Sequence, residues 1–249
     1  MGPAFVCFER QAYKAFALFL YHGVMKGDNH MVVREKFQEE LNDLQSKLNE
    51  LGQLASEALT RSLEALETKN IELALEIMED DTKADILEEE INDLAILLIA
   101  KQQPVAIDLR RIIVAIKIAT DIERIADFAV NIAKSTIRIG NEPLVKPIEH
   151  IKQMHKLNLE MLQIALEGYT EEDVVKGKKV AEMDDHVDDL YGEAIKDLLQ
   201  LSIQKPEFLP QITQLSFVCR YLERAADHTT NIAESIIYLV RGRRYDLNS

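Results

Sequence analysis

Apolar residues recur every three or four positions over a long stretch near the start of the chain, and this spacing is the strongest constraint on its fold. One face of an α-helix has this period, so the stretch predicts a single amphipathic helix over about residues 33–67. The stripe begins near Phe37 and includes Leu41, Leu44, Leu48, Leu51, Ala55, Ala58, Ser62 and Leu66.

Two further helices follow in the first half of the chain, separated by residues that typically begin or end helices. Asn70 is a good N-cap for a second helix, which is expected to run until Gln103 and Pro104 interrupt the pattern. Pro104 suits the start of a third helix, which Gly140 is expected to close. The whole chain has only 9 Gly and 6 Pro, which favours long helices with few turns.

The second half repeats this plan, with helices expected at about 147–167, 171–204 and 207–240 and a turn at Pro206 and Pro210. Residues 123–137 laid over 223–237, a shift of 100, are identical at nine of fifteen positions. The identities include Glu, Arg, Asp, Asn and Ser, which a shared apolar period does not explain. The chain therefore contains an internal repeat.

These observations predict an all-α fold of two tandem three-helix bundles that form a pseudo-twofold six-helix arrangement. We expect the first repeat to occupy residues 32–142 and the second to occupy 143–249. Residues 1–31 lack the pattern, and we interpret them as a poorly ordered leader or the product of a misassigned start upstream of Met31.

Charge and composition exclude several classes of function. A formal net charge of −14 disfavours nucleic acid as a partner, because nucleic-acid binders usually carry a basic face. Two cysteines, Cys7 and Cys219, are too few for a disulfide framework and lack the spacing of a zinc site. Apolar runs are far shorter than the roughly 18 residues that a membrane-spanning helix needs.

The repeated segment carries an acidic pair at a spacing of four residues, Glu123 with Asp127 and again Glu223 with Asp227. Residues four apart lie on one helix face, and in both copies that face is otherwise apolar. A carboxylate in such surroundings must be paired, protonated or bound to a cation. Because this placement occurs twice, we interpret the pairs as metal ligands.

The second helix of each half adds acidic pairs at the same spacing, Asp81 with Asp85 and Asp184 with Asp188. If neighbouring antiparallel helices face each other, each half brings four carboxylates together. Oxygen-only ligands suit hard ions such as magnesium, manganese, calcium or ferric iron.

Other polar residues near these pairs are given structural roles. Asn131 and Asn231, one turn further along, are expected to cap a neighbouring helix more readily than to serve as outer ligands. His186 and His228 lie off the face of the acids and are expected to be surface or hydrogen-bonded histidines.

Three functional classes remain open from the residues alone: a signalling and interaction module, a metal-dependent hydrolase or oxidase using the same carboxylates, and a structural bundle whose acids form salt bridges. An isolated pair of acids four residues apart usually lies on a solvent-exposed helix face and binds no metal. No histidine follows a Glu at the Glu-x-x-His spacing of di-iron oxidases, and no phosphate loop or nucleophile elbow is present. The residues therefore indicate no enzymatic machinery.

The segments Asp121–Asp127 and Tyr221–Asp227, each followed by Asn-Ile-Ala, resemble the PhoU family over roughly residues 33–240. The resemblance implies a cytoplasmic, non-enzymatic and often dimeric protein. Its partners would be the phosphate-specific ABC transporter and a sensor histidine kinase, and it would reach the membrane only through them. Together they would repress phosphate-starvation genes when phosphate is plentiful. The resemblance also implies metal ions, foremost a multinuclear iron cluster, with manganese, zinc or magnesium as alternatives.

Overall fold

Every regular element in the computed structural model is a helix within the residues that the structure describes, which are 3–243, 245 and 247, with side chains from residue 34 onward. This confirms the predicted fold class. In chain order the elements are α1 (Pro3–Thr68), α2 (Ile71–Asp80), α3 (Thr82–Gln102), α4 (Ile107–Ile139), α5 (Glu149–Glu171), α6 (Val174–Gln204), the 3₁₀ helix η1 (Pro206–Phe208) and α7 (Leu209–Arg241).

The chain divides into two compact units, residues 1–43 and residues 44–249. The first unit consists of the N-terminal part of α1. Because α1 begins at Pro3, the helix expected to start at residue 33 starts earlier in the structure. The side chains before Arg34 lie outside the described part of the chain, so the poorly ordered leader at residues 1–31 stays a prediction.

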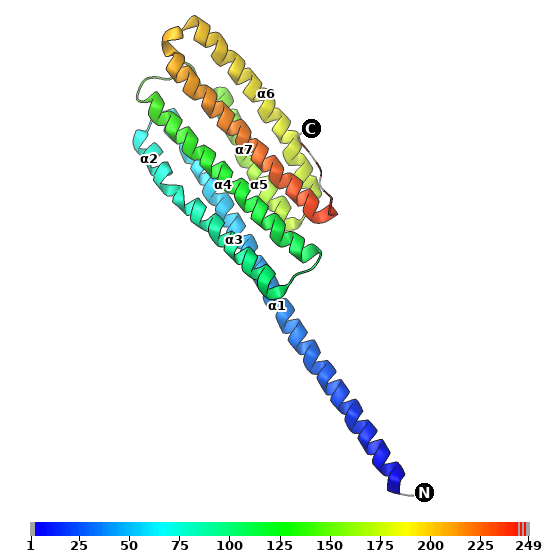
Figure 1. Cartoon of the computed structure of the whole chain (residues 1–249). Coiled ribbons are helices and arrows are strands. Elements are labelled where there is room, and N and C mark those ends of the chain that lie inside the picture. The colour runs from blue at the N-terminus through cyan, green and yellow to red at the C-terminus, as the bar shows by residue number, and fades with distance from the viewer. Residues whose placement is uncertain (1–2, 244, 246, 248–249) are drawn as a thin grey trace. The chain divides into compact units, whose positions relative to one another are not determined.

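The second unit is organised around α4 and α7, which pack along one another and run in opposite directions (Figure 1). Helices α2 and α3 pack on α4, while α5 and α6 pack on α7. Each central helix is thus the third helix of one repeat, and the two repeats are related by a pseudo-twofold arrangement. The turns α3–α4 and α6–α7 lie at opposite ends of this unit (Figure 1).

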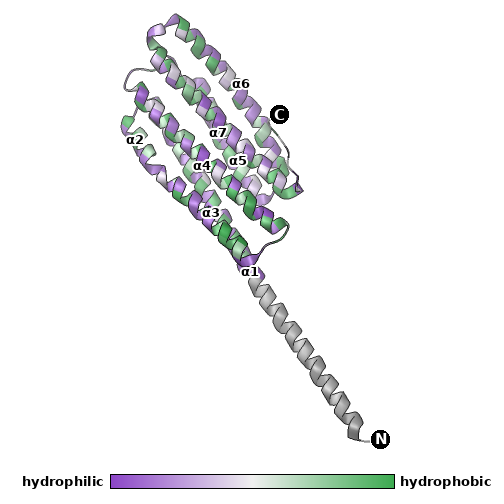
Figure 2. Ribbon diagram, viewed as in Figure 1, coloured by the Kyte–Doolittle hydropathy of each residue, from purple (hydrophilic) through white to green (hydrophobic). Residues whose placement is uncertain are grey.

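The core forms where the apolar faces of the helices meet, and apolar and polar residues alternate along every helix of this unit (Figure 2). From Leu44 onward most of the apolar stripe of α1 is buried, with Leu48, Leu51 and Leu66 fully inaccessible to solvent. The central helices contribute most, because both are covered on more than one side; their buried aliphatic residues include Ile112, Ile118, Ile122, Ile125, Leu215, Val218, Leu222 and Ile236.

The predicted second helix is wrong in one respect, since the structure breaks it into α2 and α3 at Asp81. The segment Asp80-Asp81-Thr82 is composed of residues whose side chains compete with the helix for backbone hydrogen bonds. Thr82 Oγ1 donates to the Glu79 carbonyl at 2.9 Å, and the Ala84 amide donates to the Asp81 carbonyl at 2.9 Å over three residues. The predicted cap is confirmed: Asn70 Oδ1 accepts from the Leu73 amide at 3.0 Å.

Two other helix ends differ from the prediction. Helix α4 begins at Ile107 and not directly after Pro104, because Gln103 and Ala106 have left-handed φ values of 46° and 48°. Helix α5 continues past Gly168 to Glu171, and Gly168 lets it approach α6, where an added Cβ would lie 3.1 Å from Lys176 Cβ. Among the described residues, no helix is both long and apolar enough to cross a membrane.

Candidate metal centre

The first half brings Asp81, Asp85, Glu123 and Asp127 together, and we call these four residues the first carboxylate cluster. Burial, followed by the charge of Asp127, raises the pKa of Glu123 to about 7, and Asp85 adds to the shift. Burial and then the charges of Asp85 and Asp127 raise the pKa of Asp81. Acids on α3, on α4 and at the α2–α3 break therefore repel one another across the interhelical space.

The second half brings Asp184, Asp188, Glu223 and Asp227 together as the second carboxylate cluster. Burial, followed by the charge of Asp227 among the acids, raises the pKa of Asp184 to about 7. Burial and the charge of Asp227 also raise the pKa values of Asp188 and Glu223. Asp184 and Glu223 are buried, whereas Asp188 is exposed, so this cluster opens to solvent on the α6 side.

Arginines partly compensate both clusters, which agrees with the salt-bridge alternative, but the sequence analysis did not identify the pairing residues. The helical wheel places Arg124 off the face of the acids, yet its guanidinium lies 2.7 Å from Asp127 and 3.3 Å from Glu123. Arg220 donates to Glu223 in the other half. Each arginine is three residues from its acid on the same helix, Arg124 from Asp127 and Arg220 from Glu223, and this spacing was the available signal.

The carboxylates fit a hard metal ion in donor chemistry, although they do not form a finished coordination sphere. Glu223 Oε2 is buried and has no hydrogen-bond partner, so one strong acceptor in the second cluster is unsatisfied. Burial first, and neighbouring acids second, raise the pKa values of Glu123 and Asp184, so the ionised form of an acid is disfavoured in each cluster. Within the described residues, however, no three His, Cys, Asp or Glu side chains converge as metal ligands. The side chains would have to reorient, with the arginines displaced.

The polar residues expected to surround the clusters have different partners. Asn231 Nδ2 donates to Asp121 Oδ1 at 3.4 Å, so the prediction that Asn231 caps a neighbouring helix is wrong. His228 Nδ1 lies 2.9 Å from the same Asp121 oxygen, which confirms it as a hydrogen-bonded histidine. These contacts join α7 to α4. The capping prediction for Asn231 failed because it did not consider contacts between the two halves.

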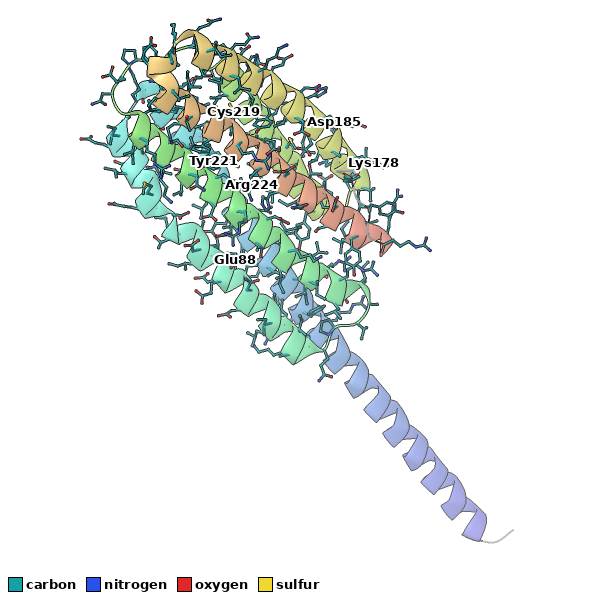
Figure 3. The ribbon with its side chains drawn as sticks, turned by 45° about the horizontal axis from the view of Figure 1, so that its top comes forward. Glu88, Lys178, Asp185, Cys219, Tyr221 and Arg224 are labelled. Atoms are coloured by element: carbon teal, nitrogen blue, oxygen red, sulfur yellow. The ribbon has the colours of Figure 1, made fainter. Side chains whose placement is uncertain are left out.

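The seam between α4 and α7 lies between the two clusters and is asymmetric. Asp121 pairs with His228, while the repeat-equivalent residues Tyr221 and Phe128 stack with their ring centroids 6.2 Å apart. The Arg224 guanidinium lies 5.0 Å from the Phe128 ring centroid. Figure 3 shows Tyr221 and Arg224 along α7, with Glu88 on the outer helix α3. The two halves therefore carry equivalent acidic clusters but have different residues at the seam between α4 and α7.

The fold and these clusters define the chain as a two-repeat helical bundle with a repeated acidic motif on the central helices. A family model described as the PhoU domain matches residues 48–136 and again residues 151–236, one match in each repeat. Together these segments cover well over half of the chain. The chain belongs to the PhoU family.

Similar proteins cover most of the chain. A phosphate-specific transport system accessory protein PhoU homolog of Clostridium acetobutylicum is 38% identical over 218 residues, which is 87% of this chain and 100% of that protein. A homolog of Rhizobium meliloti is 34% identical over 86% of this chain and 91% of its own length.

Two solved structures share the fold. The crystal structure of PhoU from Pseudomonas aeruginosa has a TM-score of 0.79 and 31% identity, covering 83% of this chain and 100% of that one. The phosphate transport system regulatory protein PhoU from Streptococcus pneumoniae also has a TM-score of 0.79, with 30% identity, 84% of this chain and 99% of that one covered. The chain is thus a PhoU-like regulatory protein of phosphate transport and not an enzyme, which removes the hydrolase or oxidase alternative.

Proposed function

We propose that this chain is a cytoplasmic adaptor that docks on the phosphate ABC transporter and on a sensor histidine kinase. In this role it represses phosphate-starvation genes while phosphate is plentiful, works as a homodimer and meets the membrane only through its partners. The observation that carries the proposal is the match over the full length of a phosphate-transport accessory protein. Every part of that relative is therefore aligned with a part of this chain.

The charge of the chain supports docking on basic partner surfaces. With a formal charge of −14, the protein should attract surfaces rich in Lys and Arg and repel acidic ones. Attraction of this kind is screened over roughly 8 Å at physiological ionic strength, so binding should weaken as salt is added.

Gene deletion tests the adaptor role. A phosphate-starvation promoter should become constitutively active at high phosphate in the deletion strain and return to repression when the gene is restored. Full repression in the deletion strain would contradict the proposal. Direct binding of the purified chain to the transporter and to the kinase, measured at rising salt, then separates the two partners.

We further propose that each carboxylate cluster holds metal ions, with iron first and manganese, zinc or magnesium as alternatives. Bound cations would neutralise the repelling acids of the two facing helices and so draw α3 toward α4 and α6 toward α7. The unsatisfied Glu223 Oε2 and the raised pKa values of Glu123 and Asp184 support this assignment.

Elemental analysis of protein purified without chelator tests the metal proposal. Replacing Glu123, Asp127, Glu223 and Asp227 together by alanine should remove the bound metal. The matched control is Glu89→Ala with Asp93→Ala, an exposed acidic pair at the same spacing on α3, which should leave metal content unchanged. Equal metal content in the fourfold variant and the wild type would refute the assignment.

A further inference from the structure

The outer face of α6 carries a regular stripe of side chains that the described part of the chain leaves uncovered. Its members follow one another at alternating spacings of three and four residues, and all are exposed: Val175, Lys178, Glu182, Asp185, Asp189, Gly192, Lys196, Leu199 and Ile203. We call these residues the α6 stripe. The buried residues of α6 repeat at the same spacing on its inner side, where the helix packs on α5 and α7. Side chains with a period of seven residues can face one neighbouring helix along their whole length.

The charged side chains of the α6 stripe are not neutralised within the chain. The ion pairs that α6 makes with the described residues involve only side chains beside the stripe: Lys176, Lys179, Glu193 and Asp197. Figure 3 shows Lys178 and Asp185 along this helix. Within the stripe the acids occupy the middle and a lysine lies on either side of them, so both signs of charge are available to a second molecule.

A second copy of the chain is the partner whose charges match this stripe. Each copy has a formal net charge of −14, so most of the surface of one copy repels the other. The α6 stripe is close to balanced, with three acids and two lysines. Two copies that meet along this stripe can therefore bring opposite charges into contact, which the acidic remainder of the surface does not allow.

We propose that the homodimer forms by antiparallel packing of the α6 stripes of two copies, with Asp185 of each copy paired with Lys196 of the other. This inference rests on the homodimer of the proposed function and names its interface. A twofold axis across the stripe repeats every contact, so two such ion pairs form. The interface is self-complementary, and the assembly closes at two copies without growing into a filament.

The charges of the stripe select this orientation and register. In a parallel pair each residue would face its own copy, so Asp185 and Asp189 would both meet like charges. An antiparallel pair shifted by seven residues in one direction would place Asp185 against Asp189, and the opposite shift would lose the pair with Lys196. In the proposed register Asp189 faces Gly192 of the second copy, which has no side chain to repel it.

The same register covers the apolar end of the stripe. Leu199 is 62% exposed and Ile203 is 83% exposed in the single chain. In the dimer Glu182 of the second copy lies opposite Leu199, and Lys178 of the second copy lies opposite Ile203. The methylene groups of long charged side chains pack on apolar surface while the charged ends stay in water. The ion pairs therefore set the alignment of the helices, and these contacts add apolar burial.

This interface agrees with the proposed adaptor function, because it leaves an acidic face free. Helix α3 lies on the other side of the central helices α4 and α7 (Figure 1), and Glu89 and Asp93 are exposed on it. The shift of 103 that relates Asp85 to Asp188 also relates Asp93 to Lys196, so α3 has an acid where the α6 stripe has its pairing lysine. Helix α3 thus suits partner surfaces rich in Lys and Arg, while α6 joins the two copies.

Charge reversal and its rescue test the ion pair. Asp185→Lys places two lysines opposite each other and Lys196→Asp places two acids there, so each variant should raise the Kd of the dimer at least about tenfold. The double variant Asp185→Lys with Lys196→Asp restores opposite charges and should return the Kd to within about threefold of wild type. Sedimentation velocity over a range of protein concentrations measures the Kd. The control, Asp93→Lys on α3, adds the same charge as Asp185→Lys and should leave the Kd within about twofold of wild type.

Cysteine cross-linking tests the register without any reversed charge. In a Cys7→Ser background, the double variant Asp185→Cys with Lys196→Cys should form a covalent dimer on oxidation, because a disulfide needs Cα atoms within about 7 Å. The two positions are about 16 Å apart along one helix, so the bond cannot form within a chain. Asp185→Cys alone is the control and should not cross-link, since antiparallel packing keeps its two copies at least about 16 Å apart. Cys219 is buried and does not compete.

The results separate failure of the inference from failure of the proposed function. A wild-type dimer whose Kd is unchanged in both reversal variants, or which Asp185→Cys alone cross-links, overturns the inference and not the homodimer. Loss of the dimer without rescue in the double reversal variant also overturns the inference. A wild-type chain that is monomeric at every concentration overturns the proposed homodimer and this inference with it, while gene deletion tests the adaptor role separately. Circular dichroism melts verify folding, and the cysteine cross-link decides where a reversal variant unfolds.

Discussion

Glu123 and Asp184 are the acids whose surroundings most oppose their ionisation, and their raised pKa values make stability depend on pH. Each has a pKa of about 7 in the folded protein, against 4.5 and 3.8 for the free side chains. Between the free and the folded pKa values, each acid is protonated in the folded state and ionised in the unfolded state. The stability that these acids contribute is therefore present at low pH and is lost as pH rises through 7.

We predict that metal-free protein loses stability between about pH 4 and pH 7, the range between the unfolded and folded pKa values of the two acids, by on the order of several kcal/mol for the two together. Urea unfolding at several pH values in the presence of chelator measures this slope. The double variant Glu123→Gln with Asp184→Asn should flatten it, whereas Glu167→Gln, at an exposed acid whose pKa is lowered by Lys176, should not. A slope unchanged by the double variant would show that other groups cause it.

The acids themselves could be predicted from sequence, and the three-residue spacing of the arginines was a signal for their ion pairs, but the side-chain conformations and the contacts between the halves could not be predicted. The spacing of four residues and the shift of 100 locate Glu123, Asp127, Glu223 and Asp227 on equivalent faces, because both follow from helix geometry. The contact of the Arg124 guanidinium with Glu123 and Asp127 depends on the conformation of the Arg124 side chain. The Asp121–His228 contact depends on how α4 and α7 are aligned. Neither is encoded in the period of a single helix.

At the scale of the helix, α6 contains two glycines in different environments. A Cβ added at Gly177 would lie 3.3 Å from the Ala233 carbonyl oxygen of α7, and the backbone cannot easily give way. A Cβ at Gly192 would meet no atom within 4 Å. Gly177 therefore permits close helix packing, while Gly192 only lowers the helix propensity of its own segment.

We predict opposite outcomes for the same substitution at these two sites. Gly192→Ala should raise the free energy of unfolding by about 0.5–1 kcal/mol, because alanine favours the helix. Gly177→Ala should lose this gain and destabilise the protein by pushing α6 from α7. Chemical denaturation of both variants measures the difference, and a stabilised Gly177→Ala variant would mean that the α6–α7 contact is looser than the structure shows.

The helices were predictable to different degrees. Long amphipathic segments such as α4 and α7 were identified because many residues contribute to one period. The break at Asp81 and the late start of α4 were missed, since a few local hydrogen bonds and two left-handed residues decide them. In both places the turn chemistry of a few residues overrides the pattern of the surrounding sequence.

For the whole molecule, two sequence repeats form one compact unit over residues 44–249. The central helices α4 and α7 belong to different repeats yet bury much of the core between them. The seam contacts Asp121–His228 and Phe128–Tyr221 also join the repeats. Separation of the halves would expose this apolar surface, so we expect both to unfold in a single cooperative transition.

Cys219 reports on this cooperativity. Its thiol is fully buried in the second repeat, and burial raises its pKa to about 12. It should therefore react with a thiol reagent only when the protein opens. A Cys7→Ser background leaves Cys219 as the only thiol in the chain.

We predict that Ile91→Ala, a substitution in the first repeat, speeds the labelling of Cys219 in the second. Ile91 is fully buried on α3, and its truncation should cost about 2–5 kcal/mol. If the repeats unfold together, the open population and hence the labelling rate rise about tenfold for every 1.4 kcal/mol lost. Ile86→Ala, at an exposed position of the same helix, is the control and should change the rate little. An unchanged labelling rate in a measurably destabilised Ile91→Ala variant would mean that the second repeat opens independently of the first.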